Sequence, residues 1–356
     1  MLISFFNGVL WLFAGYIFAR LFVRFLPFDK DALNYELKRD VYAYVWLFMF
    51  ASALLLKAFA PSSVDAIFPL LSWQIALLFI LSAFIYFAFL TENKKFLYLC
   101  VAVSSVLAAY LLTPQTDHFF GIILPYVWVI VCLSALVFVL TLASYLLAAL
   151  VGVYALFVSV FLISAGFLSL AGGLPVWLGV TAVLWAGLWI GIYQFNAEPQ
   201  KITLNTGASL SMGFLLSCFM LKANAEMAGS SVLILFSFII AELILSAYRR
   251  YILRSEETNL ALNTSHFIAY QQVLNGAPVY VLVLKIGIIN GALALFQLYS
   301  ENAFSLPVLA LVINLWMLSK MFEPEEKKTF KQLNQDFVKD LKSGIETLKD
   351  ALKKDK

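Results

Sequence analysis

Charged residues are scarce in this chain of 356 residues. They make up 13% of it, whereas about a quarter of the residues of a soluble domain are charged. Residues 119–197 contain no Asp, Glu, Lys or Arg. Hydrophobic residues reach 63%, and the mean hydropathy is +0.91. These values exclude a soluble globular domain and predict a protein that crosses a membrane several times.

Cysteine and histidine are also rare. The three cysteines, Cys100, Cys132 and Cys218, all lie in apolar stretches, so we expect small core residues rather than a disulfide or a metal site. Only two histidines are present. His118 follows Asp117 in a polar turn without a second ligand pair at metal spacing, and we expect both side chains to be solvated.

The first helix lacks the basic flank of a signal peptide, so an uncleaved span is expected. Long apolar runs favour membrane helices over a barrel of alternating strands. The sequence therefore predicts an all-α, polytopic fold with eleven spans. They are expected near 2–24, 42–60, 68–90, 96–113, 120–144, 150–171, 174–194, 208–223, 230–248, 279–298 and 304–321.

Basic residues predict the orientation, because cytoplasmic loops carry the excess of Lys and Arg. With the N-terminus outside, all but three of the 24 basic residues fall on one side. The three exceptions are Lys57, Lys222 and Lys285. We therefore expect a periplasmic N-terminus and a cytoplasmic C-terminus, in a bacterial inner membrane. The net charge of +3 is spread over many loops and does not indicate nucleic-acid binding.

The composition changes after residue 321, which predicts a membrane domain (1–321) followed by a cytoplasmic tail (322–356). Apolar residues recur every three or four positions through 330–352, as on one face of an amphipathic helix. Such a helix could lie on the membrane surface or on the protein's own loops, or it could dock a partner protein.

Residues 195–214 read FNAEPQKITLNTGASLSMGF, a polar segment that leads into an apolar helix. The segment resembles the best-marked motif of the polyprenyl-phosphate N-acetylhexosamine-1-phosphate transferases, roughly FNxxPxKIxxGDxGSxxxGF. That family includes phospho-N-acetylmuramoyl-pentapeptide and undecaprenyl-phosphate N-acetylglucosamine-1-phosphate transferases. The resemblance implies the same membrane topology. The aspartate of the motif falls on Thr206.

The resemblance implies that aspartates on cytoplasmic loops would hold Mg²⁺ between the substrate phosphates. Those aspartates are missing here. The pair after the third span would lie near Tyr86–Ala88, where no acid is present and Glu92 is the nearest. In the family's loop after the fifth span, the first glycine aligns with Gly152, and the two aspartates align with Val151 and Tyr154. The degenerate catalytic positions are Val151, Tyr154 and Thr206.

The resemblance also indicates residues that could bind phosphate or lipid without a metal, since cationic and amide groups can hold a phosphate directly. A basic pair follows the ninth span, and a histidine further on matches the first position of the family's His-rich loop. The candidates are Asn196, Lys201, Asn205, Arg249, Arg250 and His266. No metal ligands or cofactors are predicted, and Mg²⁺ is expected only if the chain is an active enzyme.

Three functions are compatible with these patterns. The first is a catalytically degenerate relative of the transferases, acting as a subunit, regulator or polyprenyl-phosphate-binding protein in cell-envelope glycan assembly. The second is an active transferase with diverged residues, which would move a sugar phosphate from a UDP-sugar to undecaprenyl phosphate. The third is a transporter or flippase, which would place ionisable residues at the membrane midplane, and Glu242 and Lys285 are the only candidates.

Overall fold

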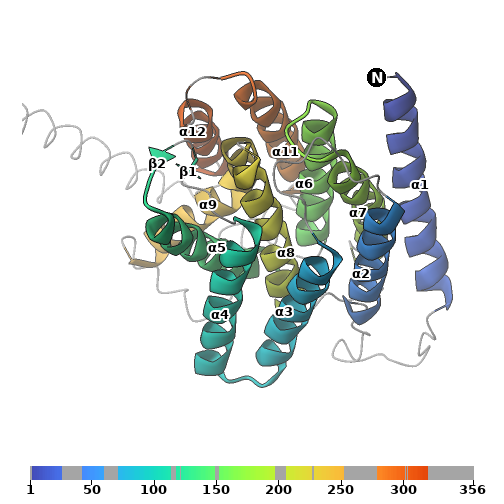
Figure 1. Cartoon of the computed structure of the whole chain (residues 1–356), viewed down its shortest axis with the longest axis horizontal. Helices are drawn as coiled ribbons and strands as arrows, with labels where there is room; N and C mark the ends of the chain where they lie inside the picture. Colours follow the sequence, from blue (N-terminus) through green and yellow to red (C-terminus); the bar gives the residue numbers. More distant parts are fainter. Residues whose placement is uncertain are drawn as a thin grey trace, which may run out of the picture.

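The computed structural model describes residues 2–25, 42–59, 71–113, 118–120, 122–148, 152–196, 206–226, 228–251, 279–300, 302 and 304–319. Within these ranges the chain forms eleven α-helices and one hairpin of two-residue strands (Figure 1). The elements are α1 (Leu2–Phe25), α2 (Tyr42–Phe59), α3 (Ser72–Leu90), α4 (Lys94–Leu112), β1 (His118–Phe119), β2 (Ile122–Ile123), α5 (Tyr126–Ala148), α6 (Val153–Leu170), α7 (Val176–Asn196), α8 (Thr206–Ala225), α9 (Gly229–Tyr251), α11 (Val279–Gln297) and α12 (Ser305–Ser319).

All eleven predicted spans correspond to helices. The largest difference is at the fifth span, which begins at Tyr126 instead of residue 120. The antiparallel β1–β2 hairpin occupies the intervening segment and pairs His118 with Ile123. Pro125 then begins the helix, and its carbonyl accepts hydrogen bonds from the first turn. The apolar composition of the hairpin concealed this boundary.

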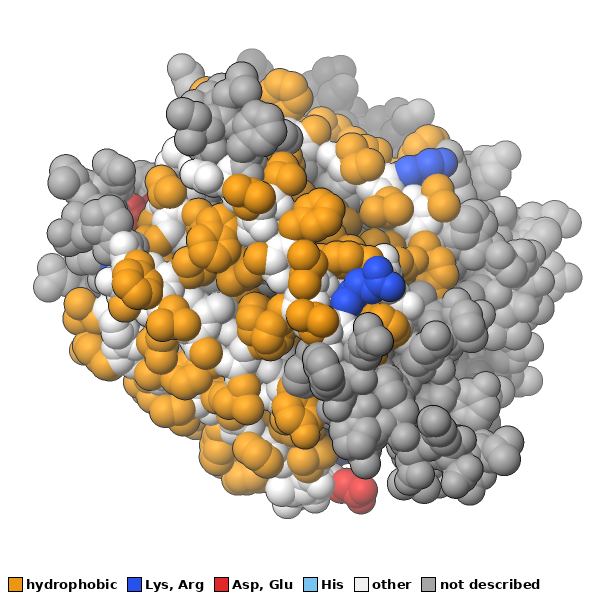
Figure 2. Space-filling view, turned by 90° about the vertical axis from the view of Figure 1, so that its right-hand side faces the viewer, with side chains coloured by type: hydrophobic (Ala, Val, Ile, Leu, Met, Phe, Trp, Pro, Cys, Tyr) orange, Lys and Arg blue, Asp and Glu red, His pale blue; other side chains and the backbone are white. Residues whose placement is uncertain are grey.

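Nine of the described helices have at least 18 residues and are apolar enough to cross a membrane. Large apolar side chains on their outer faces are exposed, among them Leu55, Val127 and Ile288. Figure 2 shows one such face, where hydrophobic side chains dominate and charged ones are few. Lipid is the solvent that suits this surface. The chain is therefore a multi-pass helical membrane protein.

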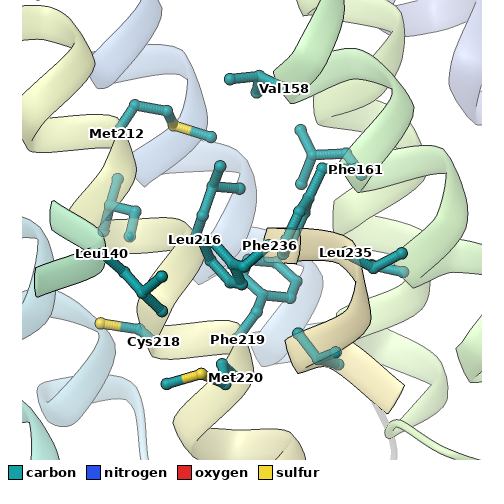
Figure 3. Packing of buried hydrophobic residues seen from close by; sticks show 14 of the residues in the cluster. Leu140, Val158, Phe161, Met212, Leu216, Cys218, Phe219, Met220, Leu235 and Phe236 are labelled. Atoms are coloured by element: carbon teal, nitrogen blue, oxygen red, sulfur yellow. The ribbon is translucent and has the colours of Figure 1, made fainter. Parts of the chain in front are cut away.

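Helix α8 is the centre of the bundle, although it is the least hydrophobic of these nine spans. Every residue from Gly207 to Ala225 is buried. It packs against α3, α4, α5 and α9, and Figure 3 shows Leu216 of α8 beside Phe236 of α9. A helix enclosed by protein does not need an apolar surface toward lipid, so it accommodates small and hydroxyl residues.

Helices α1 and α7 approach each other closely through small residues. A Cβ atom on Gly15 would collide with the backbone of Leu184, and one on Gly187 would collide with the backbone of Leu12. Gly187 and Gly191 form a G-x-x-x-G pair, the spacing that permits close packing of membrane helices.

Candidate functional site

Tyr154 lies in the first turn of α6, directly after a tight turn that Gly152 makes possible. Gly152 has a φ of 75°, a left-handed conformation that most residues avoid. The turn starts α6 so that its first residues face the interior of the bundle, and Tyr154 is only 3% exposed. Its ring contacts Trp189 edge to face at 6.1 Å between centroids.

The Tyr154 hydroxyl links α6 to the first turn of α8. It donates a hydrogen bond of 2.9 Å to the backbone carbonyl of Ser209. The Ser209 hydroxyl in turn donates to the carbonyl of Thr206 at 2.8 Å. Thr206 begins α8 and is half-buried. Two of the degenerate catalytic positions, Tyr154 and Thr206, are therefore brought together.

A second group of hydroxyl and indole side chains joins α2 and α3 to α8. Tyr42 donates to the Ser211 hydroxyl at 2.6 Å, and Ser211 donates to the carbonyl of Ser82 at 2.7 Å. Trp46 donates through its indole N–H to the Ser82 hydroxyl at 2.8 Å. The Tyr42 ring lies 5.1 Å from that of Tyr86, where the missing aspartate pair was expected.

The two groups are neighbours, because Tyr154 bonds Ser209 and Tyr42 bonds Ser211, and these two serines lie within one turn of α8. The positions predicted for the missing carboxylates in three different loops therefore converge around the start of α8. Hydroxyl and aromatic side chains fill them. We name Tyr42, Ser82, Tyr154, Ser209 and Ser211 the hydroxyl cluster.

A cleft of about 620 Å³ lies beside this cluster, which is within the range of small-molecule sites. Helices α3, α4, α5 and α8 line it, and the turn from α3 to α4 lies at the lower end of the bundle in Figure 1. Glu92 and Lys94 contribute opposite charges, and Tyr98 and Tyr145 contribute hydroxyls. Leu210 places α8 in the wall, one turn after Thr206.

Glu92 is held in the α3–α4 turn by backbone geometry that is unusual for its residue type. Its φ is 57°, in the left-handed region where glycine is commoner. Its N–H bonds the carbonyl of Phe89 at 3.1 Å, which ends α3. Asn93 then starts α4 by accepting a hydrogen bond from the Phe96 N–H at 3.2 Å. The turn thus positions the carboxylate on the wall of the cleft.

The described donor groups do not fit a magnesium site of the transferase type. Mg²⁺ requires hard oxygen ligands, normally with more than one negative charge when it also holds a diphosphate. Among the described lining residues of the cleft, Glu92 is the single carboxylate. The described part of the chain contains no cluster of three or more His, Cys, Asp or Glu side chains that could hold a metal ion.

Several predicted site residues lie outside the described residues. These are Val151, Lys201, Asn205 and His266, and the amphipathic segment 330–352 does so as well. Only the backbone is described for Asn196 at the end of α7 and for Arg249 and Arg250 near the end of α9.

The two ionisable residues predicted within spans are separate. Glu242 is fully buried in α9 and accepts a hydrogen bond of 3.4 Å from Ser246, whereas Lys285 is exposed on α11. The described residues show no ion pair between them. His118, predicted to be solvated, is half-buried in β1, and Asn224 of α8 donates to its backbone carbonyl at 3.1 Å. Asp117, of which the same was predicted, lies outside the described residues. Cys100 and Cys218 are buried free thiols, as expected, and Cys132 is half-buried.

Sequence reasoning identified Tyr154, Thr206 and Glu92 but missed Tyr42, Ser82 and Ser211. Isolated hydroxyl residues in apolar helices carry no motif, and their proximity depends on how the helices pack. No protein-family model matches this chain, and no curated protein shows detectable sequence similarity to it. The class of protein is therefore defined by the fold alone.

Proposed function

We propose that this protein is a catalytically degenerate relative of the polyprenyl-phosphate sugar-1-phosphate transferases. It would act in the bacterial inner membrane as a non-catalytic subunit, regulator or polyprenyl-phosphate-binding protein of cell-envelope glycan assembly, with a periplasmic N-terminus and a cytoplasmic C-terminus. The observation that carries the proposal is the convergence of Tyr86, Tyr154 and Thr206, the positions of the missing acids, around the start of α8.

The chemistry of the hydroxyl cluster supports a role without catalysis. Its side chains are neutral and donate to carbonyl or hydroxyl groups of the protein itself. A hydroxyl committed in this way is a poor ligand for a hydrated cation, and burial makes an unpaired charge costly there. The cluster holds α2, α3 and α6 against α8, which is a structural task.

The adjacent cleft supports retained ligand binding. It combines apolar walls from Leu97, Leu142 and Leu210 with the polar groups of the α3–α4 turn. A lipid phosphate has the same two parts, an apolar chain and a charged head. Arg249 and Arg250 could add positive charge, since α9 begins close to the end of α8 and packs along it, which brings the end of α9 toward the start of α8.

Binding and catalysis can be tested on the same purified protein. We expect undecaprenyl phosphate to raise the thermal unfolding midpoint, and neutral undecaprenol to leave it unchanged. With a UDP-sugar and Mg²⁺ added, we expect no release of UMP above a protein-free control. The Arg249→Ala/Arg250→Ala variant should lose the lipid effect, whereas Lys285→Ala, exposed on α11, should retain it. Equal effects of the phosphate and the alcohol would contradict the binding proposal.

Glu92 favours a second candidate, an active transferase with diverged residues, because it places one carboxylate on the cleft. This candidate predicts magnesium-dependent UMP release that falls in the Glu92→Ala/Thr206→Ala variant. Release at the same rate from that variant and from the wild type would dismiss it.

A further inference from the structure

Lys57 and Lys222, two of the three exceptions to the charge asymmetry of the chain, lie near each other in the structure. Lys57 stands over the ring of Trp177, and Trp177 and Lys222 line the same cavity, although the residues are far apart in the sequence. Lys57 is close to the end of α2 and Lys222 is close to the end of α8. Both helices begin at the hydroxyl cluster, so the lysines mark the opposite end of the bundle.

A cavity of about 50 Å³ extends from Lys222 into the protein between α2, α3, α4, α7 and α8. Each helix contributes residues from one of its faces, and on α8 these residues are three or four positions apart. Every lining side chain is at most 7% exposed, so buried residues form the walls, and the cavity is partly open to the outside. The lining includes Ala53, Phe79, Trp177, Trp185 and Cys218.

The chemistry of the walls selects an apolar occupant. Thr181 and Lys222 are the polar residues among the lining side chains that the structure describes. The Thr181 hydroxyl already donates to the carbonyl of Trp177 at 2.8 Å, and Lys222 forms an ion pair with Glu226. A water molecule needs about 10–15 Å³ and two to four polar partners, so the cavity has the room but not the partners for water. An alkyl chain needs no such partners.

The charge at the rim selects the head group. The Lys57 ammonium lies 5.2 Å from the centre of the Trp177 ring, so it stands directly beside the wall of the cavity. Glu226 forms an ion pair with Lys222, and Lys57 adds a positive charge beside the wall of the cavity. An anionic head group would complement Lys57.

We propose that this cavity binds part of one alkyl chain of an anionic amphiphile, whose carboxylate or phosphate head contacts Lys57. The site is separate from the hydroxyl cluster and from the cleft at the other end of α8. It does not depend on the function proposed above.

Tryptophan fluorescence can test this site, because Trp177 and Trp185 line it and bromine atoms quench indole emission on contact. The protein in detergent is titrated with 9,10-dibromostearate, and in a second arm with a brominated lysophosphatidate. We expect saturable quenching that is absent from the Trp177→Phe/Trp185→Phe variant. The arm that saturates at the lower concentration identifies the carboxylate or the phosphate as the preferred head.

Two variants test the chain and the head separately. Lys57→Gln should weaken binding about tenfold, as expected for loss of one charge-assisted contact, whereas Lys285→Gln should not. Ala53→Leu, which fills the cavity, should abolish saturable quenching while the protein still unfolds cooperatively. Equal quenching by the neutral methyl ester, or unchanged binding to Ala53→Leu, would overturn the proposal. Cys218→Leu gives an independent filling variant if Ala53→Leu does not fold.

Discussion

The hydroxyl of Tyr154 donates a 2.9 Å hydrogen bond to the carbonyl oxygen of Ser209, and this bond joins the start of α6 to the start of α8. In the transferases that the sequence resembles, a carboxylate would occupy the position of Tyr154. Ser209 would lie in the segment beside a second carboxylate, whose position is Thr206. Here a neutral donor satisfies a backbone acceptor in the same place. If the proposed descent holds, this bond replaces a metal-binding arrangement with one that stabilises the bundle.

Tyr154→Phe removes this donor and preserves the ring that packs against Trp189. We expect a loss of about 1 kcal/mol in the free energy of unfolding, because a buried carbonyl loses one of its partners. The unfolding midpoint in detergent measures the change. Tyr110→Phe is the control, since Tyr110 is 60% exposed. An equal midpoint for Tyr154→Phe and the wild type would show that the bond contributes nothing to stability.

Restoring the acids tests the alignment on which the proposed function depends. The Tyr154→Asp/Thr206→Asp variant should be less stable than the wild type, because two carboxylates enter a buried region. If these positions are the former ligand positions, millimolar Mg²⁺ should raise its unfolding midpoint and should leave the wild type unchanged. Tyr154→Asn/Thr206→Asn has the same size without charge and should not respond. No response from the aspartate variant would count against shared descent.

The close crossing of α1 and α7 predicts a steric effect. Gly187→Leu would place its side chain where the backbone of Leu12 lies, so α1 must move away from α7. We expect a lower unfolding midpoint and loss of the hydrogen bond from Tyr16 to Gln194, which is 2.9 Å long. Gly8→Leu is the matched control, because an added Cβ at Gly8 meets no atom within 4 Å. Similar midpoints for both variants would contradict the packing described here.

The positions of the helices could be predicted from the sequence, because long apolar runs of residues indicate membrane spans. The arrangement around α8 could not. Its serines and glycines lower its hydropathy, and only the surrounding helices reveal why the bundle can bury them. Tyr154 and Thr206 were identified through a motif, whereas Tyr42 and Ser211 belong to helices far apart in the sequence. Lys57 and Lys222 were visible as exceptions in a charge count, but their proximity depends on packing.

A polar contact between three helices allows a last prediction. Asn314 of α12 donates to the Ser237 hydroxyl of α9 at 2.6 Å and to the Asn290 side chain of α11 at 3.2 Å. Interhelical hydrogen bonds in membranes contribute about 0.6 kcal/mol on average and up to about 1.7. Because Asn314 bonds two helices, we expect Asn314→Ala to reduce the free energy of unfolding by about 1–2 kcal/mol.

A double-mutant cycle with Asn290→Ala should give a coupling free energy of about 0.5–1 kcal/mol, since the pair shares one bond. Ser319→Ala, which removes an exposed bond within α12, should have no measurable effect, and additive effects of the two asparagine substitutions would show that their contact is not stabilising.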